Sequence, residues 1–153
     1  MSFRLTSSAF AEGETIPKRY TCDGADQSPP LTWSDPPAGT QSLALIVEDP
    51  DAPSGTFVHW VIYRLSPSPA ELTAGVPRQA ELPNGARQGR NSFRRVGYGG
   101  PCPPAGAPHH YHFQLFALDL SPDVTSGASA SELRSAMNGH IVGQTELVGL
   151  YGR

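Results

Sequence analysis

Ionisable side chains gather at two places in the sequence, each where an apolar segment begins or ends. Asp49 follows the apolar residues 43–47, while His109 and Tyr111 come just before the apolar residues 113–118. Apolar segments of this length are typical of β-strands, so a carboxylate, an imidazole and a phenol are expected at strand ends. These groups accept or donate charge-assisted hydrogen bonds, which is what a pocket for a small anion needs.

Two prolines stiffen the segment that carries Asp49 and Asp51. Pro50 and Pro53 each fix their own φ angle and favour an extended conformation in the residue before them. A stiff segment can hold a carboxylate in a pocket without help from a helix. The alternative interpretation is an exposed turn with two solvated aspartates.

His59 lies in an apolar segment and is open to two interpretations. With the two-residue period of a strand, it shares a face with Phe57 and Val61. A histidine on such a face is either a core residue whose hydrogen bonds are satisfied or a group of the pocket.

Residues 109–112 read His-His-Tyr-His and offer two different sites. In a strand, His109 and Tyr111 share one face, and His110 and His112 share the other. If the first pair points inward, an imidazole and a phenol join the pocket. If the second pair does, a His-x-His metal site becomes available.

The neighbouring residues argue against the metal site. A His-x-His site for iron or zinc wants a carboxylate a few residues further on, and residues 113–116 supply none. A cysteine-rich zinc site wants paired cysteines, whereas Cys22 and Cys102 are single and far apart. We therefore expect no metal and no other cofactor.

Residues 85–100 form a basic, glycine-rich loop. Its arginines are Arg87, Arg90, Arg94 and Arg95. Backbone N–H groups exposed at the glycines of residues 97–100 can form an anion-binding nest, and positive charge near a pocket speeds the arrival of phosphates. The alternative is a solvated arginine loop. The chain contains no dinucleotide fingerprint, no P-loop and no nucleophile elbow.

Length and charge restrict the function classes. A chain of 153 residues suits one domain, residues 1–153, with a substantial core. Its net charge of −3 argues against a non-specific nucleic-acid binder. No apolar run approaches the roughly 20 residues of a membrane-spanning helix, so stable membrane insertion is not expected. The first residues do not resemble a secretory signal, which favours the cytoplasm.

Two cysteines do not make a disulfide framework in a chain of this size. Cys22 and Cys102 both lie in loops rich in glycine or proline. Whether these loops approach closely enough for a disulfide is left open by the sequence.

Six segments rich in Val, Ile, Leu, Phe and Tyr are expected to be strands. They are residues 3–5, 31–33, 42–47, 57–65, 110–120 and 145–151. Residues 42–47 and 57–63 are apolar at nearly every position, which is typical of strands covered on both faces.

One helix is expected near the end of the chain. Ser129 and Glu132 form a capping-box pattern at its start, and Gly139 ends it. A single helical turn is also predicted over residues 71–75. The whole pattern predicts a mainly β domain that closes with a strand–helix–strand unit and has its small helices at an edge.

In this order and spacing, the motifs resemble the phosphatidylethanolamine-binding protein family, specifically its short bacterial and archaeal Raf-kinase-inhibitor-like branch. The resemblance covers nearly the whole chain. Its motifs are Tyr-Thr-Cys-Asp-Gly at 20–24, Ser-Pro-Pro-Leu-Thr-Trp at 28–33, Glu-Asp-Pro-Asp-Ala-Pro at 48–53, Val-His-Trp-Val at 58–61, Gly-Tyr-Gly-Gly-Pro-Cys-Pro-Pro at 97–104, His-His-Tyr at 109–111 and Gly-His-Ile at 139–141.

The resemblance implies a sandwich of two antiparallel sheets with a C-terminal strand–helix–strand element. It also implies a ligand site made of Asp49, His59, His109, Tyr111, Gly99, Gly100 and Pro101. The expected rim residues are Asp51, Tyr98, Arg94 and His110. Asp49 is expected to accept from a histidine N–H or to meet the ammonium of an ethanolamine group, and the glycine N–H groups are expected to donate to the anion.

The implied function is non-enzymatic binding of phosphate-like anions or phosphorylethanolamine-type headgroups. The family also implies inhibition of a kinase or serine protease as a protein partner, and it makes a homodimer plausible. The alternative is a hydrolase or metal-dependent enzyme that uses the same histidines and aspartate. Three departures from the family's usual pattern, at Ser92, Arg94 and His110, bear on ligand preference.

Overall fold

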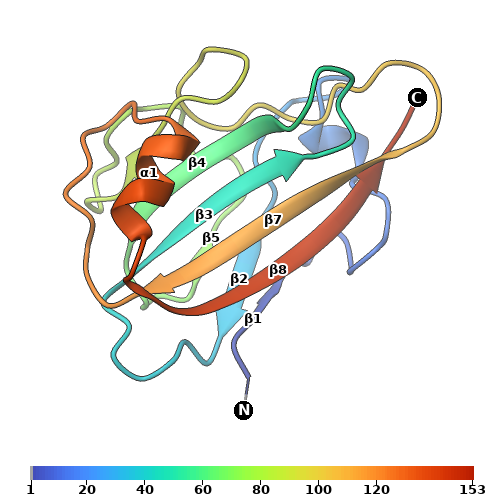
Figure 1. Ribbon diagram of the computed structural model, residues 1–153. Helices are drawn as coiled ribbons and strands as arrows, with labels where there is room; N and C mark the ends of the chain where they lie inside the picture. The colour runs from blue at the N-terminus through green and yellow to red at the C-terminus, as the bar shows by residue number, and fades with distance from the viewer. Residues whose placement is uncertain (1) are drawn as a thin grey trace.

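Two antiparallel sheets face each other across the main apolar core (Figure 1). The structure is a computed structural model and describes residues 2–153. The larger sheet has the order β6-β4-β3-β7-β8, with β6 at Arg87–Gln88, β4 at Phe57–Leu65, β3 at Ser42–Asp49, β7 at His109–Leu118 and β8 at Ile141–Tyr151. The smaller sheet has the order β1-β2-β5, with β1 at Arg4–Thr6, β2 at Leu31–Ser34 and β5 at Glu71–Leu72. The predicted sandwich is confirmed.

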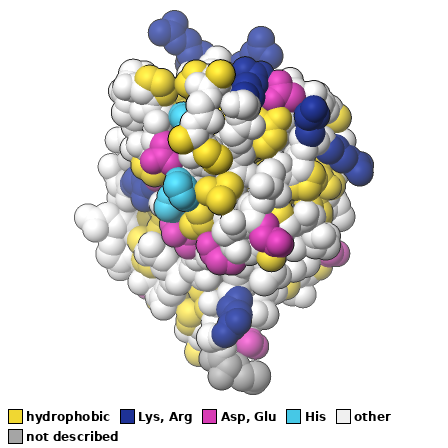
Figure 2. All heavy atoms as spheres, turned by 90° about the vertical axis from the view of Figure 1, so that its right-hand side faces the viewer, with side chains coloured by type: hydrophobic (Ala, Val, Ile, Leu, Met, Phe, Trp, Pro, Cys, Tyr) yellow, Lys and Arg dark blue, Asp and Glu magenta, His cyan; other side chains and the backbone are white. Residues whose placement is uncertain are grey.

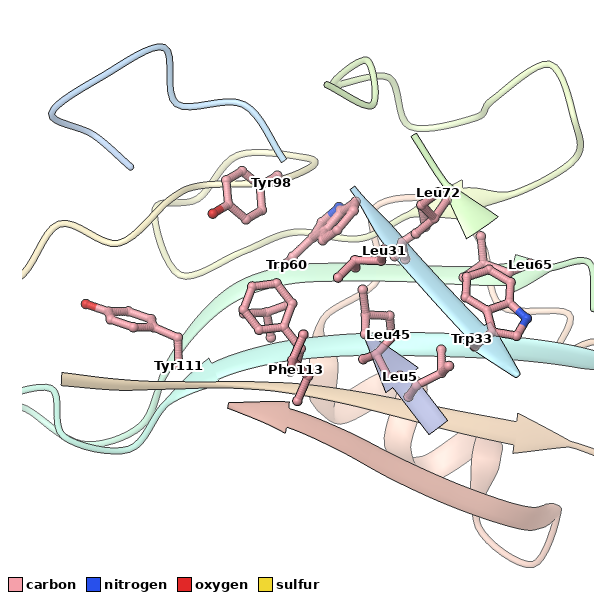
Figure 3. Packing of buried hydrophobic residues seen from close by; sticks show 14 of the residues in the cluster. Leu5, Leu31, Trp33, Leu45, Trp60, Leu65, Leu72, Tyr98, Tyr111 and Phe113 are labelled. Carbon is pink, nitrogen blue, oxygen red and sulfur yellow. The ribbon is translucent and has the colours of Figure 1, made fainter. Parts of the chain in front are cut away.

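The larger sheet is covered on both faces. Leu43 and Leu45 of β3 belong to the core between the sheets (Figure 3), whereas Ala44 and Ile46 belong to a second cluster on the opposite face. Because both faces are buried, β3 lacks the alternation of apolar and polar residues that a half-exposed strand shows, as its sequence predicted.

The helix α1, Ala130–Met137, covers the second face of the larger sheet. Leu133 and Met137 pack into the cluster that contains Ile46. The predicted capping box is present, since the Ser129 side chain accepts from the N–H of Glu132 and the Glu132 side chain accepts from the N–H of Ser129. The helix packs against central strands of the sheet and not at an edge, because its apolar stripe needs an apolar face to cover it.

The predicted helical turn over residues 71–75 is wrong. Glu71 and Leu72 form β5, which pairs with β2 through Leu72 and Leu31. Tertiary pairing decides the conformation of so short a segment. Strand β6 and the short 3₁₀ helix Lys18–Tyr20 were not predicted, since two or three residues show no period.

The edge of β8 is partly covered by the chain segment at residues 13–16. The N–H groups of Gly13 and Ile16 donate to carbonyls of β8 at Val148 and Leu150, at 2.8 and 2.7 Å. At the other end of β8, Ile141 and Val142 are exposed.

A disulfide joins Cys22 to Cys102 across 80 residues of sequence. The question that the sequence left open is thereby answered. Closing so long a loop removes conformational freedom from the unfolded chain, which stabilises the fold. None of the helices in residues 2–153 is long and apolar enough to cross a membrane. The cytoplasm stays a prediction, and disulfides are more common in oxidising compartments.

Candidate functional site

Asp49, which is buried, and His109, which is partly buried, form a pair at one end of the larger sheet. Asp49 is the last residue of β3 and His109 the first of β7, and these two strands are neighbours. The Nδ1 atom of His109 lies 2.6 Å from Oδ2 of Asp49, while Oδ1 of Asp49 accepts the N–H of Asp51 at 2.8 Å. Both carboxylate oxygens are therefore engaged, and Nε2 of His109 is left for a ligand. This contact matches one of the two roles that the sequence interpretation offered for Asp49, acceptance from a histidine N–H. Contact of Asp49 with a ligand's ammonium stays a prediction.

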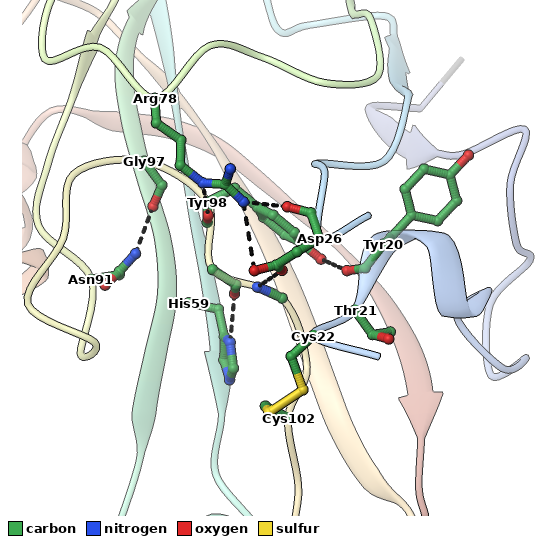
Figure 4. A network of polar contacts seen from close by, with 12 residues as sticks. Tyr20, Thr21, Cys22, Asp26, His59, Arg78, Asn91, Gly97, Tyr98 and Cys102 are labelled. Carbon is green, nitrogen blue, oxygen red and sulfur yellow. Dashed lines mark hydrogen bonds and ion pairs between the residues drawn. A yellow bond between two sulfur atoms is a disulfide. The ribbon is translucent and has the colours of Figure 1, made fainter. Parts of the chain in front are cut away.

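His59 is held by a backbone carbonyl. Its Nδ1 atom donates to the carbonyl oxygen of Gly99 at 2.7 Å, as Figure 4 shows. Because a carbonyl can only accept, Nδ1 carries the hydrogen and Nε2 has a free lone pair in the neutral ring. Burial lowers the pKa of His59, although the hydrogen bond to Gly99 opposes the shift. At neutral pH, Nε2 of His59 is thus an acceptor.

Tyr111 carries a buried hydroxyl with no partner. Its side chain is 1% exposed, and within residues 2–153 nothing forms a hydrogen bond with the hydroxyl. In Figure 3 the ring lies at one end of the core and the hydroxyl points away from the other labelled side chains. Burial raises the pKa of Tyr111, so the hydroxyl keeps its proton. An unpaired buried hydroxyl costs about 1–3 kcal/mol, which a ligand oxygen would relieve.

These four side chains line one cavity of about 220 Å³. The rest of its wall consists of Ala52, Pro53, Ser54, Phe57, Phe93, Cys102, Pro103 and Pro104. No lysine or arginine is part of the wall that the structure describes. Figure 2 shows this end of the molecule, where histidine and acidic side chains lie among hydrophobic ones and dark blue basic side chains gather above them.

The glycine segment contributes differently from the prediction. The N–H of Gly99 donates to the carbonyl of His59 at 2.9 Å, and the N–H of Gly100 donates to Oδ1 of Asp26 at 2.8 Å. Neither amide is free for an anion in this structure, so the predicted nest is wrong. Instead, the carbonyl of Gly99 orients His59.

Gly99, Gly100 and Pro101 do not line the cavity that contains Tyr111. The two glycines line a neighbouring cavity, and the carbonyl of Pro101 accepts the N–H of Cys22 at 3.1 Å. A Cβ atom at Gly100 would lie 2.5 Å from the Asp26 carboxylate. Glycine is needed at position 100 for this close approach.

Two of the predicted rim residues form an exposed pair beside the cavity. Oδ2 of Asp51 accepts from both the backbone N–H and Nδ1 of His110, each at 2.8 Å. These hydrogen bonds lower the pKa of Asp51. The change at His110 thus adds a partner to Asp51 and no group to the cavity wall.

The other rim predictions have different outcomes. Tyr98 is buried and donates its hydroxyl to the carbonyl of Tyr20 at 2.6 Å, so it is not a rim residue. Arg94 is exposed and does not line the cavity. Ser92 acts in the fold, because its Oγ accepts the N–H of Val58 at 2.8 Å.

The outward histidines of β7 do not converge on one point. His110 contacts Asp51, whereas His112 lies 3.2 Å from the carboxylate of Glu146. Within residues 2–153, no group of three or more His, Cys, Asp or Glu side chains is arranged to hold a metal ion.

Phe93 is a site residue that the sequence interpretation missed. Its ring makes an edge contact with Phe57, with 4.7 Å between centroids, and a second one with His59 at 5.6 Å. It is 40% exposed at the cavity mouth. The available signal was its position as the one aromatic residue in the arginine-bearing stretch 87–95.

Fold and site together define a small β-sandwich protein with a polar pocket at one end of its larger sheet. The family model described as phosphatidylethanolamine-binding protein matches residues 6–152, and the chain belongs to this family.

Relatives of known sequence and structure agree with this assignment. A UPF0098 protein of Pyrococcus horikoshii is 49% identical, over 100% of this chain and 78% of its own length. One of Methanothermobacter thermautotrophicus is 48% identical, over 97% and 98%. The crystal structure of the Chlamydia trachomatis homologue CT736 superposes with a TM-score of 0.91 at 42% identity, covering 99% and 98% of the two chains. That of E. coli YbcL, titled a new member of the mammalian PEBP family, gives 0.92 at 35%, covering 100% and 99%.

Proposed function

We propose that the chain is a binding protein for small phosphorylated or otherwise anionic ligands of the phosphorylethanolamine type. The observation that carries the proposal is the buried, unpartnered hydroxyl of Tyr111 in the wall of a cavity. The same wall holds His59 and His109, and each ring has one nitrogen fixed by the protein. Each of the three groups has one position free for a hydrogen bond. The tyrosine hydroxyl and a protonated imidazole both donate to phosphate oxygens.

The cavity carries no unpaired positive charge at neutral pH, so binding of an anion is expected to be coupled to uptake of a proton. Asp49 is paired with His109, and His59 is neutral when the cavity is empty at neutral pH. An anion beside Nε2 of His59 favours a proton between that nitrogen and a phosphate oxygen. Affinity should therefore fall as the pH rises.

Binding fits the pocket better than hydrolysis does. Cys102 lies in the wall but is part of a disulfide, so it offers no thiolate. Ser54 is the serine in the cavity wall and thus the candidate nucleophile. It forms no hydrogen bond with His59 or His109 in the described chain. A serine nucleophile needs such a base to activate it. Inhibition of a kinase or serine protease, and pairing of two copies, stay predictions.

Calorimetric titration with O-phosphorylethanolamine in the presence of a chelator tests the proposal. The wild type should bind, and His109→Ala should bind about thirtyfold more weakly, because one charge-assisted hydrogen bond is lost. His112→Ala is the matched control, since this histidine lies on the opposite face of the same strand. Wild-type affinity should also be lower at pH 8.5 than at pH 5.5. An absence of binding in the wild type would overturn the proposal, and so would equal losses in the two variants.

A further inference from the structure

A second cavity of about 340 Å³ adjoins the first. Phe93 lines both cavities, and the disulfide contributes Cys102 to the first and Cys22 to the second. Gly99 and Gly100 form part of the second wall. Phe93 and the disulfide therefore border both cavities.

The second cavity contains the arginines that the first one lacks. Arg78 and Arg95 both line it. Arg78 is already engaged: its Nε donates to the carbonyl of Tyr98 at 2.8 Å, and Nη2 lies 3.6 Å from the carboxylate of Asp26, the one acidic residue of this wall (Figure 4). Asp26 also accepts the N–H of Gly100. Arg78 and Asp26 thus neutralise one another.

Arg95 is the free charge of the cavity. Its side chain is exposed, and its guanidinium makes no hydrogen bond or ion pair with any residue from 2 to 153. Its backbone is nevertheless fixed, because the buried side chain of Asn91 accepts the N–H groups of Phe93 and Arg95 at 2.9 and 3.2 Å. Asn91 itself is anchored to the carbonyl of Gly97 at 2.9 Å. These hydrogen bonds fix the loop so that the positively charged side chain of Arg95 is presented at the cavity.

We propose that the second cavity is an anion subsite that extends the first pocket through Arg95. The ligand class is then small molecules that carry a carboxylate or second phosphate in addition to the phosphate monoester. The inference rests on the proposed function, which supplies the first anchor. A planar guanidinium binds a carboxylate or phosphate through two parallel hydrogen bonds, which suits the second group.

Two matched ligand pairs test the subsite by calorimetry at low salt. O-phosphoserine differs from O-phosphorylethanolamine by one carboxylate close to the phosphate. 6-Phosphogluconate differs from glucitol 6-phosphate, which is likewise an open six-carbon chain, by a carboxylate in place of the CH2OH group at the far end. In at least one pair, the ligand with two anionic groups should bind about fivefold more tightly, as one partly exposed ion pair allows.

Arg95→Gln should abolish this preference and leave the affinity for the singly anionic ligand unchanged. Arg94→Gln is the control, since it removes a neighbouring exposed arginine that does not line the cavity. Equal affinities within both pairs in the wild type overturn the subsite alone, as does an equal effect of the two substitutions. If neither singly anionic ligand binds, the proposed function fails with it.

Discussion

The surroundings of Tyr98 and Tyr111 show how a packed region and a pocket differ in one chain. Both tyrosines are at least 98% buried, and burial raises both pKa values. The hydroxyl of Tyr98 donates to the carbonyl of Tyr20, whereas that of Tyr111 has no partner in the described chain. The first hydroxyl completes the fold. The second leaves an unsatisfied group where a ligand could complete it, so it is the one that indicates function.

The largest expected effect comes from removing the disulfide between the two regions. Cys22 follows Tyr20 and Thr21 in the segment that accepts from Tyr98, and Cys102 lies in the wall beside Tyr111. The double variant Cys22→Ser, Cys102→Ser should lose about 4.5 kcal/mol of unfolding free energy, as expected for a closed loop of 80 residues. Urea unfolding measures the loss.

The same double variant should also bind phosphorylethanolamine more weakly, because the segment at Cys102 is no longer tied down. Oxidised and reduced wild type provide the control, since reduction should reproduce the effect of the substitutions. Unchanged stability would mean that the bond does not hold the two regions together.

Effects of intermediate size on stability and on binding are expected when Tyr98 and Tyr111 are each changed to phenylalanine. Tyr98→Phe should lower the unfolding free energy by about 1–2 kcal/mol, since the buried carbonyl of Tyr20 loses its donor. Its affinity for phosphorylethanolamine should stay the same. Tyr111→Phe should keep or slightly raise the stability and weaken binding about tenfold. Thermal unfolding and calorimetry on both variants complete the comparison, and matching behaviour would remove the basis for calling Tyr111 functional.

The smallest expected effect on stability is at Asp23, which accepts a hydrogen bond from a third tyrosine, Tyr151. The hydroxyl of Tyr151 donates to Asp23 at 2.6 Å, and hydrogen bonds from Arg153 and Tyr151 lower the pKa of Asp23 from 3.8 to about 2. Because the folded-state pKa is lowered, the stabilisation is present above about pH 4 and is lost as the pH falls toward 2. In urea unfolding, Asp23→Asn should therefore be less stable than the wild type at pH 6, with the gap closing by pH 2. Asp35→Asn is the matched control, since Asp35 is exposed and its side chain forms no hydrogen bond or ion pair with residues 2–153.

Much of the fold could be predicted because strands buried on both faces, such as β3 and β4, are apolar at nearly every position. The capping box at Ser129 likewise fixed the start of α1 from local chemistry alone. Short elements such as β5 and β6 could not be predicted, since each is two residues long and depends on a partner strand distant in the sequence.

The candidate site shows a similar division. Alternation along β7 placed His109 and Tyr111 on one face, and the structure brings both into one cavity with Asp49 and His59. The role of Gly99 and Gly100 was not predictable in the same way. Which acceptor a backbone N–H finds depends on how distant segments pack, here the segment that carries Asp26.

The covered edge of β8 has a consequence for aggregation. An open strand edge is a template on which other chains can add strands. Residues 13–16 occupy that template along the half of β8 that runs beside the start of β7, where His109 and Tyr111 lie. Strand addition is thereby blocked along this half of the edge, whereas Ile141 and Val142 at the other end of β8 are exposed. The half of the β8 edge that lies next to the polar site is thus the half protected against added strands.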